Sequence, residues 1–225
     1  MLRIDVIDGW LISNGLPKLS ADQADKFKKY QELLLEAGKK FNLTRIAGDY
    51  DIAVKHFVDS LTLLPWVDEA MSDAAERGIS FLDLGTGAGF PGIPLKILRS
   101  ELKLTLLDSL HKRINFLRGV APELGLVDIE CVHARAEELA KLPGRGSSYD
   151  ICAARAVAKL GPLASAALPL VRRGGLFLAM KGPGAPGELA SARSSIKKSR
   201  GEVECVREVF ISEDAVRFVV AIRKI

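Results

Sequence analysis

Residues 81–94 read FLDLGTGAGFPGIP, and this stretch decides how the rest of the chain is interpreted. A short apolar run that carries one acid, Asp83, leads into a loop crowded with glycine. Four glycines fall within eight residues: Gly85, Gly87, Gly89 and Gly92. Glycine permits positive φ and a close approach of the backbone to a ligand. An apolar strand that passes through such a loop into a helix predicts a ligand site at the loop.

The neighbours of the glycines narrow the choice of ligand. Residues 87–92 satisfy the pattern G-x-G-x-x-G of dinucleotide-binding proteins, in which a pyrophosphate lies at a helix N-terminus. Pro91 and Pro94 interrupt the backbone N–H groups that a pyrophosphate needs. Asp83 would repel a phosphate but could hold a cationic amino group, directly or through water. We therefore expect S-adenosylmethionine (SAM), which has no phosphate, and Asp108 could take its ribose hydroxyls.

Short apolar runs alternate with helical stretches from residue 79 onward. We expect strands at 79–84, 103–107, 129–133, 150–154 and 176–181, helices at 94–99, 112–124, 137–142 and 160–170, and a turn-rich loop at 181–187. Such alternation is typical of a doubly wound, mostly parallel sheet. Two last strands, at 203–210 and 215–222, are joined by only four residues, so they must be antiparallel. The expected fold class is α/β, a seven-stranded Rossmann-like sheet with an antiparallel C-terminal hairpin.

Residues 1–78 have a different texture and are expected to be helical. Ser20 and Gln23 form a capping-box pattern, and apolar residues recur at helical spacing after it. The sequence predicts a loop over 42–51 and then a helix over 52–64, which Pro65 ends or bends. We expect this segment to be a helical extension packed on a ligand-binding domain of residues 79–225.

Composition and charge bound the classes of function. The chain has 225 residues, of which 48% are hydrophobic and 27% charged, as in an ordinary globular protein. Residues 1–70 hold 9 Lys or Arg against 11 Asp or Glu, so the basic excess of the whole chain, +4, lies in the remainder. This bias fits a polyanionic partner such as nucleic acid, although a solvated basic surface is the alternative. No apolar stretch approaches a membrane span and no signal peptide is visible, so we expect a cytoplasmic protein.

The motifs resemble a known family. Residues 83–89, DLGTGAG, match the D-x-G-x-G-x-G pattern of class I SAM-dependent methyltransferases. Further motifs resemble the RsmG (GidB) family over nearly the whole chain: NLT at 42–44, HFVDSL at 56–61, GTGAGFPG at 85–92, ARA at 154–156 and KGP at 181–183. Phe90 and Ala154 depart from the leucine and serine of many relatives. The resemblance implies transfer of a methyl group from SAM to N7 of one guanine in 16S ribosomal RNA, with S-adenosylhomocysteine as the second product.

The resemblance also implies roles for individual residues. It puts the following in contact with SAM: Gly85, Phe90, Ala136, Glu137 and Arg155. Asp83, Gly87, Gly89 and Asp108 belong to the same site by the argument from the loop. His56 and Asp59 would border the site on the substrate side; a hydrogen bond along one helix face is the alternative, and two such residues alone do not indicate a metal site. We expect a monomer whose partner is the small ribosomal subunit or its assembly intermediate.

Methylation at N7 of guanine is consistent with the residues in and after the predicted fourth and fifth strands. N7 has an in-plane lone pair, so no proton must leave before methyl transfer. Residues 153–157 lack the Asn or Asp followed by Pro-Pro that exocyclic-amine methylation commonly uses. Cys152 lies inside a predicted strand, whereas methylation of a pyrimidine C5 needs a cysteine nucleophile in a loop. Arg155 and Lys181, at the ends of the fourth and fifth strands, are the candidate catalytic residues, with a salt bridge and a plain loop lysine as their structural alternatives.

Other functions stay open at this stage. Lys112 and Arg113, on the helix expected at 112–124, are candidate RNA contacts. The first rival is a SAM-dependent methyltransferase of a small molecule or protein, which the basic excess disfavours. A nicotinamide-dependent oxidoreductase is a second rival, opposed by Asp83 and the two prolines. A binding module that has lost catalysis is a third, opposed by the unbroken glycine loop.

Overall fold

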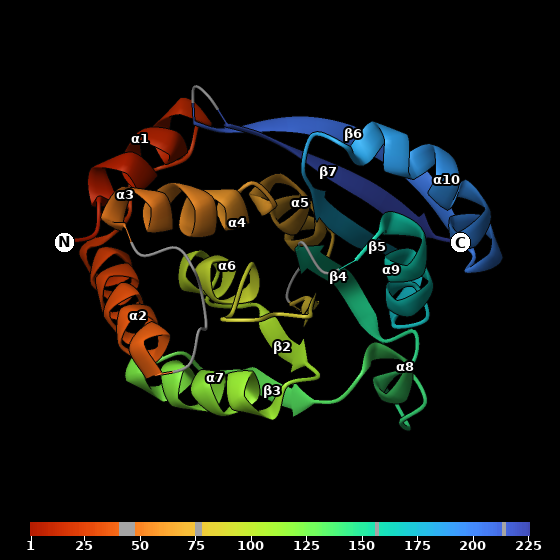
Figure 1. Ribbon diagram of the computed structural model, residues 1–225, viewed down its shortest axis with the longest axis horizontal. Coiled ribbons are helices and arrows are strands. Elements are labelled where there is room, and N and C mark those ends of the chain that lie inside the picture. The colour runs from red at the N-terminus through yellow and green to blue at the C-terminus, as the bar shows by residue number, and fades with distance from the viewer. Residues whose placement is uncertain (41–47, 75–77, 156–157, 213–214) are drawn as a thin grey trace.

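The computed structural model describes residues 1–40, 48–74, 78–155, 158–212 and 215–225. Its centre is a seven-stranded sheet in the order β3-β2-β1-β4-β5-β7-β6 (Figure 1). The strands are β1 (Ser80–Leu84), β2 (Lys103–Asp108), β3 (Ile129–His133), β4 (Tyr149–Arg155), β5 (Val171–Lys181), β6 (Gly201–Ser212) and β7 (Ala215–Lys224). Strands β1 to β5 pair in parallel, and β7 is antiparallel to both β5 and β6. The predicted α/β class and the terminal hairpin are confirmed.

Helices cover both faces of the sheet. One face carries α6 (Gly92–Leu98) and α7 (His111–Glu123), and the other carries α8 (Ala136–Leu139), α9 (Leu160–Ala167) and α10 (Ala185–Lys198). Successive side chains of a strand point to opposite faces, so Phe81 joins the hydrophobic cluster under the first set of helices and Leu82 the cluster under the second. The carboxyl ends of the parallel strands are left as the place for a ligand.

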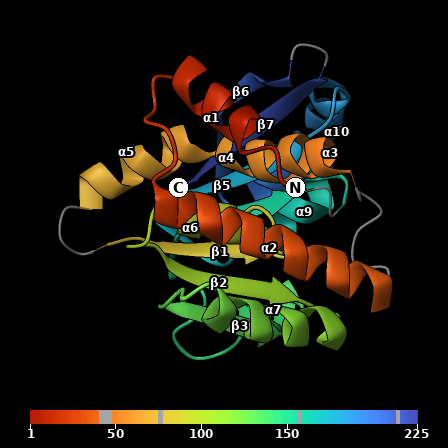
Figure 2. The same cartoon turned by 90° about the vertical axis from the view of Figure 1, so that its left-hand side faces the viewer.

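The N-terminal segment packs against the face that carries α6 and α7. It contains α1 (Ile4–Ser13), α2 (Ala21–Lys40), α3 (Asp49–Ile52), α4 (Asp59–Leu61) and α5 (Leu64–Ala74), with a π-helix, η1 (Ala53–Val58), between α3 and α4. Helix α2 contacts α6 and α7, and Figure 2 shows it in front of α6. The capping box is confirmed, because the Ser20 amide donates to Gln23 Oε1 at 3.0 Å and the Gln23 amide donates to Ser20 Oγ at 3.2 Å. Division of the chain at residue 78 stays a prediction.

Several boundaries differ from the sequence prediction: β5 begins at Val171 instead of residue 176, and a π-helix interrupts the helix predicted over 52–64. Helix α10 begins at Ala185, inside the expected turn-rich loop, because Pro186 occupies the first helical turn, where its missing N–H costs nothing. Helix α5 begins at Leu64, so Pro65 lies at the start of a helix. Helix α3 begins at Asp49, although the sequence predicts a loop up to residue 51. The predicted motif at 42–44 and the last residue of the motif at 154–156 lie outside the described residues.

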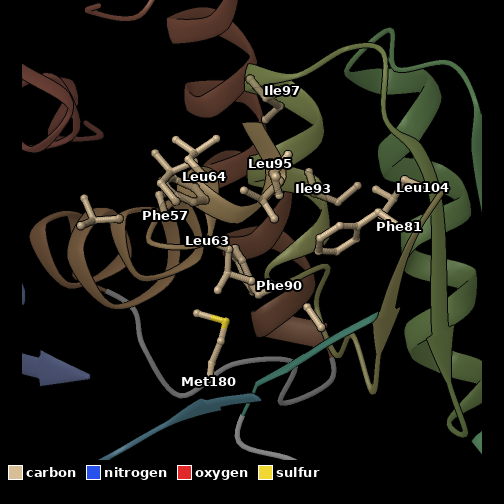
Figure 3. Close-up of a cluster of buried hydrophobic side chains, with 14 of the residues drawn as sticks. Phe57, Leu63, Leu64, Phe81, Phe90, Ile93, Leu95, Ile97, Leu104 and Met180 are labelled. Atoms are coloured by element: carbon tan, nitrogen blue, oxygen red, sulfur yellow. The ribbon is translucent and has the colours of Figure 1, made fainter. Parts of the chain in front are cut away.

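The hydrophobic core continues into the wall of a cavity. Figure 3 shows Phe90 and Met180 at one end of the large cluster, near the ends of the strands. Both side chains line the cavity that lies there. Packing of the core therefore fixes part of the candidate site directly.

Candidate active site

A cavity of about 950 Å³ lies at the carboxyl ends of β1, β2, β4 and β5. Residues predicted from sequence meet at it: Gly85, Gly87, Phe90, Asp108, Arg113, Arg155, Lys181, His56 and Asp59. A larger cavity, of about 1150 Å³, lies between α1, α5 and β6, and none of the predicted site residues lines it. The smaller cavity is therefore the candidate active site.

Five backbone amides of the glycine loop, those of residues 85–87, 89 and 90, are bonded within the protein. The amides of Gly85 and Thr86 donate to the Leu107 carbonyl at 2.8 and 3.0 Å, which ties the loop to β2. The Gly87 amide donates to Asp108 Oδ2 at 3.0 Å, and two further amides of the loop donate to the Thr86 carbonyl. A pyrophosphate would need free amides as donors. Because these amides are already bonded within the protein, the loop suits a ligand without phosphate, as SAM is.

The structure gives one physical reason for glycine at position 87 and another for glycine at position 89. Gly87 has a φ of 62°, and an added Cβ would lie no closer than 4.0 Å to another atom, the Gly85 carbonyl oxygen, so glycine there serves the backbone conformation. At Gly89 a Cβ would lie only 2.5 Å from the Tyr30 hydroxyl of α2. That hydroxyl donates to the Ala88 carbonyl at 2.5 Å. Gly89 has a φ of 108° and packs closely against the N-terminal segment, which both favour glycine; it does not line the cavity, and its predicted contact with the ligand stays a prediction.

Asp83 lies beneath the loop. Its Oδ2 accepts hydrogen bonds from Thr86 Oγ1 and from the Gly92 amide, each at 2.7 Å. Its Oδ1 is buried with no hydrogen-bond partner among the described residues. Burial raises the pKa of Asp83 to about 7, and the two hydrogen bonds oppose the shift. Asp83 is fully buried and does not line the cavity, so a contact with the ligand stays a prediction.

Asp108 joins the loop to the edge of the cavity. Its Oδ2 accepts from the Gly87 amide and from Arg113 at 3.1 Å, and its Oδ1 accepts from the Leu110 amide at 2.9 Å. A carboxylate has about four acceptor positions, so capacity is left for a ribose hydroxyl. Lys112 is exposed and does not line the cavity, whereas Arg113 does.

Arg155 is held by the N-terminal segment. Its Nη1 donates to the Lys55 carbonyl at 2.9 Å and to Asp59 Oδ2 at 3.0 Å. Its Nη2 lies 3.1 Å from His56 Nδ1, and its guanidinium carbon lies 4.7 Å from the centre of the Phe90 ring. Arg155 therefore forms a salt bridge and also lines the cavity, so the two predicted alternatives are compatible. A guanidinium has five N–H donors, so three bonds to protein leave donors for a substrate.

His56 is held in one protonation state. Its ring stacks on Phe90, with centroids 4.4 Å apart and planes 9° apart. Burial, assisted by the charge of Arg155, lowers the pKa of His56 to about 3, so the ring is neutral near pH 7. Because Nδ1 accepts from Arg155, the ring proton resides on Nε2. The residue lies in η1, a π-helix, a rare conformation that is frequent at functional sites.

Asp59 lies between two arginines. Its Oδ2 bonds Arg155, and its Oδ1 lies 3.5 Å from Nε of Arg217 on β7. Burial raises the pKa of Asp59, and the two guanidinium charges oppose the shift. Arg217 also lines the cavity, although it is not among the residues predicted from the sequence. Its position inside an apolar strand was the available signal, since a charge there needs a partner.

Lys181 is bonded on the opposite side of the cavity. Its Nζ donates to the Ala158 carbonyl at 2.5 Å and to Glu188 Oε2 at 2.8 Å. The same Glu188 oxygen accepts from the Leu160 amide at 2.8 Å, so the pair joins β5 to the starts of α9 and α10. Glu188 was missed because the sequence predicts no helix there.

Two further predictions are not brought to the cavity. Ala136 and Glu137 begin α8, and neither lines it. A contact between SAM and either residue therefore stays a prediction. Among the described residues no group of three or more His, Cys, Asp or Glu is placed to hold a metal ion.

Solved structures share the fold at low sequence identity. TYW2 of M. jannaschii in complex with AdoMet has a TM-score of 0.53 and 14% identity, covering 71% of this chain and 76% of that one. The [4+2]-cyclase SpnF has a TM-score of 0.51 and 14% identity, covering 71% and 80%. Such likeness shows the fold alone, and the cyclase illustrates that this fold does not fix the reaction.

Sequence relatives are more specific. The family model described as rRNA small subunit methyltransferase G (GidB) matches residues 23–215. A ribosomal RNA small subunit methyltransferase G from Clostridium botulinum (strain Loch Maree / Type A3) is 42% identical over 202 residues, covering 89% of this chain and 82% of its own. Its counterpart from Lactobacillus delbrueckii subsp. bulgaricus is 41% identical over 210 residues, covering 92% and 86%. This chain belongs to the rRNA small subunit methyltransferase G (GidB) family.

Proposed function

We propose that this chain transfers the methyl group of SAM to N7 of one guanine in 16S ribosomal RNA, acting on the small subunit or its assembly intermediate. Membership of the family supports the methyltransferase activity and the ribosomal RNA substrate. The bonded amides of the glycine loop support SAM over a dinucleotide. When bound, SAM supplies an electrophilic methyl group on a sulfonium.

The hydrogen bonds of the acidic and imidazole side chains in the cavity wall support N7 of guanine as the methyl acceptor. In the described part of the cavity wall, each such side chain is bonded: His56 and Asp59 to Arg155, Asp108 to Arg113, and Glu188 to Lys181. The His56 ring is neutral, but its Nδ1 accepts from Arg155. A general base must reach the proton that it removes. A site without a ready base favours an acceptor that has no proton to lose, and N7 of guanine is one.

Positioning is then the main task of the protein. Holding the acceptor in line with the donor can supply several kcal/mol of the barrier. Arg155 has donors left after its bonds to Lys55, His56 and Asp59, and guanine presents O6 and N7 as acceptors on one edge. A donor from Arg155 to O6 would orient the base and leave the N7 lone pair for the methyl group. Asp108, Gly85 and Gly87 would hold SAM on the side of the glycine loop.

A labelled-subunit experiment tests this function. Small subunits from cells that lack the protein would be incubated with purified protein and methyl-labelled SAM, and the product mapped by N7-specific strand cleavage. One new cleavage in 16S RNA is the expected result. Label in RNA without cleavage would contradict N7 chemistry. No label in subunits or extracted RNA would favour the rival that methylates a small molecule or protein.

We also propose that the protein is a cytoplasmic monomer. In the described part of the chain no helix has both the length and the apolar character to cross a bilayer. Light scattering after gel filtration should give the mass of one chain, 24.4 kDa. A mass of twice that value would contradict the monomer.

A further inference from the structure

A basic surface borders the cavity at one edge of the sheet. We call it the α7 edge and define it by these residues: His111, Lys112, Asn115, Arg118 and His133, all of them exposed. Helix α7 and strand β3 lie side by side there (Figure 1). Ser109 and Arg113, which flank the start of α7, line the cavity. The α7 edge is thus continuous with the wall that Asp108 forms.

Hydrogen bonds fix the two imidazoles of the α7 edge. His133 Nε2 lies 3.0 Å from the Ser109 carbonyl, which can only accept, so Nε2 carries a proton. Asn115 Nδ2 lies 3.3 Å from His111 Nδ1, so the amide donates there and His111 carries its proton on Nε2. The two rings meet edge to face with centroids 5.2 Å apart. An imidazole N–H on an exposed helix start is a donor suited to a phosphate oxygen.

The cations of the α7 edge are not neutralised by neighbouring acids. Lys112 has no ion pair among the described residues, and Arg118 donates only to Asn115 Oδ1 and the Cys131 carbonyl, each at 3.4 Å. The acids of the same elements are bonded elsewhere. Glu123 pairs with Lys29, Glu130 with Arg145, and Glu138 accepts from the Arg135 amide. Glu137 is the remaining exposed acid near the end of β3.

We propose that the α7 edge binds the phosphate backbone of the RNA strand that enters the cavity, next to the nucleotide that is methylated. This inference rests on the proposed function. Phosphate contacts position a nucleic acid without reading its sequence, which suits a surface of cations and N–H donors with no exposed aromatic platform. Arg113 is not counted in the α7 edge, because it pairs with Asp108 and lines the cavity, and its predicted contact with RNA stays a prediction.

A second basic surface provides an internal comparison. Lys197, Lys198 and Arg200 lie at the C-terminal end of α10 and just beyond it, beside the amino end of β6, and are also exposed. The chain end packs against them, since the Ile225 amide donates to the Arg200 carbonyl at 2.9 Å. That end of the sheet is opposite the cavity, because β7 returns there antiparallel to β5. A strand that leads into the cavity would meet the α7 edge first.

Two charge-matched double variants test the proposal. Lys112→Ala with Arg118→Ala removes two cations from the α7 edge, and Lys197→Ala with Lys198→Ala removes two from the end of α10. The measurements are cosedimentation with small subunits at several salt concentrations, the KM for subunits, and the Kd for SAM. For the first variant we expect a KM raised about tenfold or more, an unchanged Kd for SAM, and a salt slope shallower by roughly one to two. The second variant should bind subunits like the wild type.

The outcomes separate this proposal from the function on which it rests. Equal losses in both variants, or a loss only in the second, would overturn the α7 edge. A wild-type KM and salt slope in the first variant would also overturn the α7 edge. The charge reversal Arg118→Glu checks that result, because it would then leave subunit binding unchanged as well. Salt-dependent binding that requires the α7 edge, without methyl transfer by the wild type, would support the surface and overturn the reaction. Matching melting temperatures would show that both variants fold.

Discussion

The two walls of the cavity are built by different means. The wall toward β1 and β2 is a contiguous loop whose amides bond to neighbouring carbonyls and to Asp108. The wall toward the N-terminal segment is made of side chains from distant parts of the chain, with Arg155 bonded to Lys55, His56 and Asp59. The first wall is one continuous loop fixed mainly by the adjacent strand β2, whereas the second joins segments about 100 residues apart in sequence. This contrast predicts that the two walls can be damaged separately.

Replacing Arg155 should have the largest effect. Arg155→Ala leaves the buried Asp59 with Arg217 as its ion-pair partner at 3.5 Å. Loss of one partner of a buried pair costs about 3–5 kcal/mol of unfolding free energy, and loss of substrate orientation should lower kcat at least about 100-fold. Denaturant unfolding and single-turnover kinetics would measure both. Arg217→Ala is the matched control and should cost less, because Arg217 is the more exposed of the two arginines. An Arg155→Ala protein that loses only SAM affinity would break the distinction between the walls.

Asp83, which lies beneath the glycine loop, should make the unfolding free energy depend on pH. Its folded-state pKa, about 7, lies above the ordinary value of 3.8, so the folded state retains a proton that the unfolded chain releases between these values. Stability from this group is complete below about pH 4 and is lost as pH rises to about 7. Relative to Asp83→Asn, the unfolding free energy of the wild type should fall by roughly 2–4 kcal/mol across that window. Parallel curves for the two proteins would contradict the raised pKa.

Replacing Tyr30 tests whether the N-terminal segment affects the wall that the glycine loop forms, where SAM is proposed to bind. Its hydroxyl bonds the Ala88 carbonyl inside the loop and occupies the space beside Gly89. Tyr30→Phe removes that bond, worth about 1 kcal/mol, so the Kd for SAM should rise about fivefold while kcat at saturating SAM stays unchanged. Calorimetric titration with SAM is the measurement, and Tyr50→Phe, at an exposed tyrosine, is the control. A fall in kcat instead would mean that α2 acts on the substrate side.

The smallest effect is expected at Glu188. Glu188→Gln keeps an acceptor for the Leu160 amide but removes the charge that pairs with Lys181. A partly exposed pair contributes at most about 1 kcal/mol, so the unfolding free energy should change by no more than about 1 kcal/mol and kcat by less than about fivefold. Lys181→Ala would then discriminate roles. A drop in kcat far larger than that of Glu188→Gln would support Lys181 as a catalytic residue, and equal small effects would make it a structural lysine.

The sequence predicts most of the sheet because strand periodicity is local. All seven predicted strands are present, although β5 begins at Val171 instead of residue 176, and the hairpin follows from a connection too short for a crossover. Helix α10 was missed because local rules for glycine and proline signal a turn, whereas Pro186 fits the first turn of a helix. Propensity rules do not distinguish these two uses of proline without the packing that follows.

The candidate site likewise contains residues that the sequence predicts and residues that only the fold brings together. Gly85, Gly87 and Asp108 follow from the strand-end rule and line the cavity. Arg217 and Glu188 act through partners far away in sequence, and one chain without its fold does not display such pairs. The motif also did not indicate the close packing of Gly89 against Tyr30, which lies in α2. Contacts of this kind depend on tertiary structure alone.

The Asp59 carboxylate has a consequence for synthesis of the chain. Its partners Arg155 and Arg217 are made roughly 100 and 160 residues later, and Arg217 lies on the last strand. Domains fold as units while the chain emerges from its N-terminus, and an unpaired buried carboxylate is costly. A nascent chain therefore has no complete cavity until its final strand has left the ribosome and paired with β5.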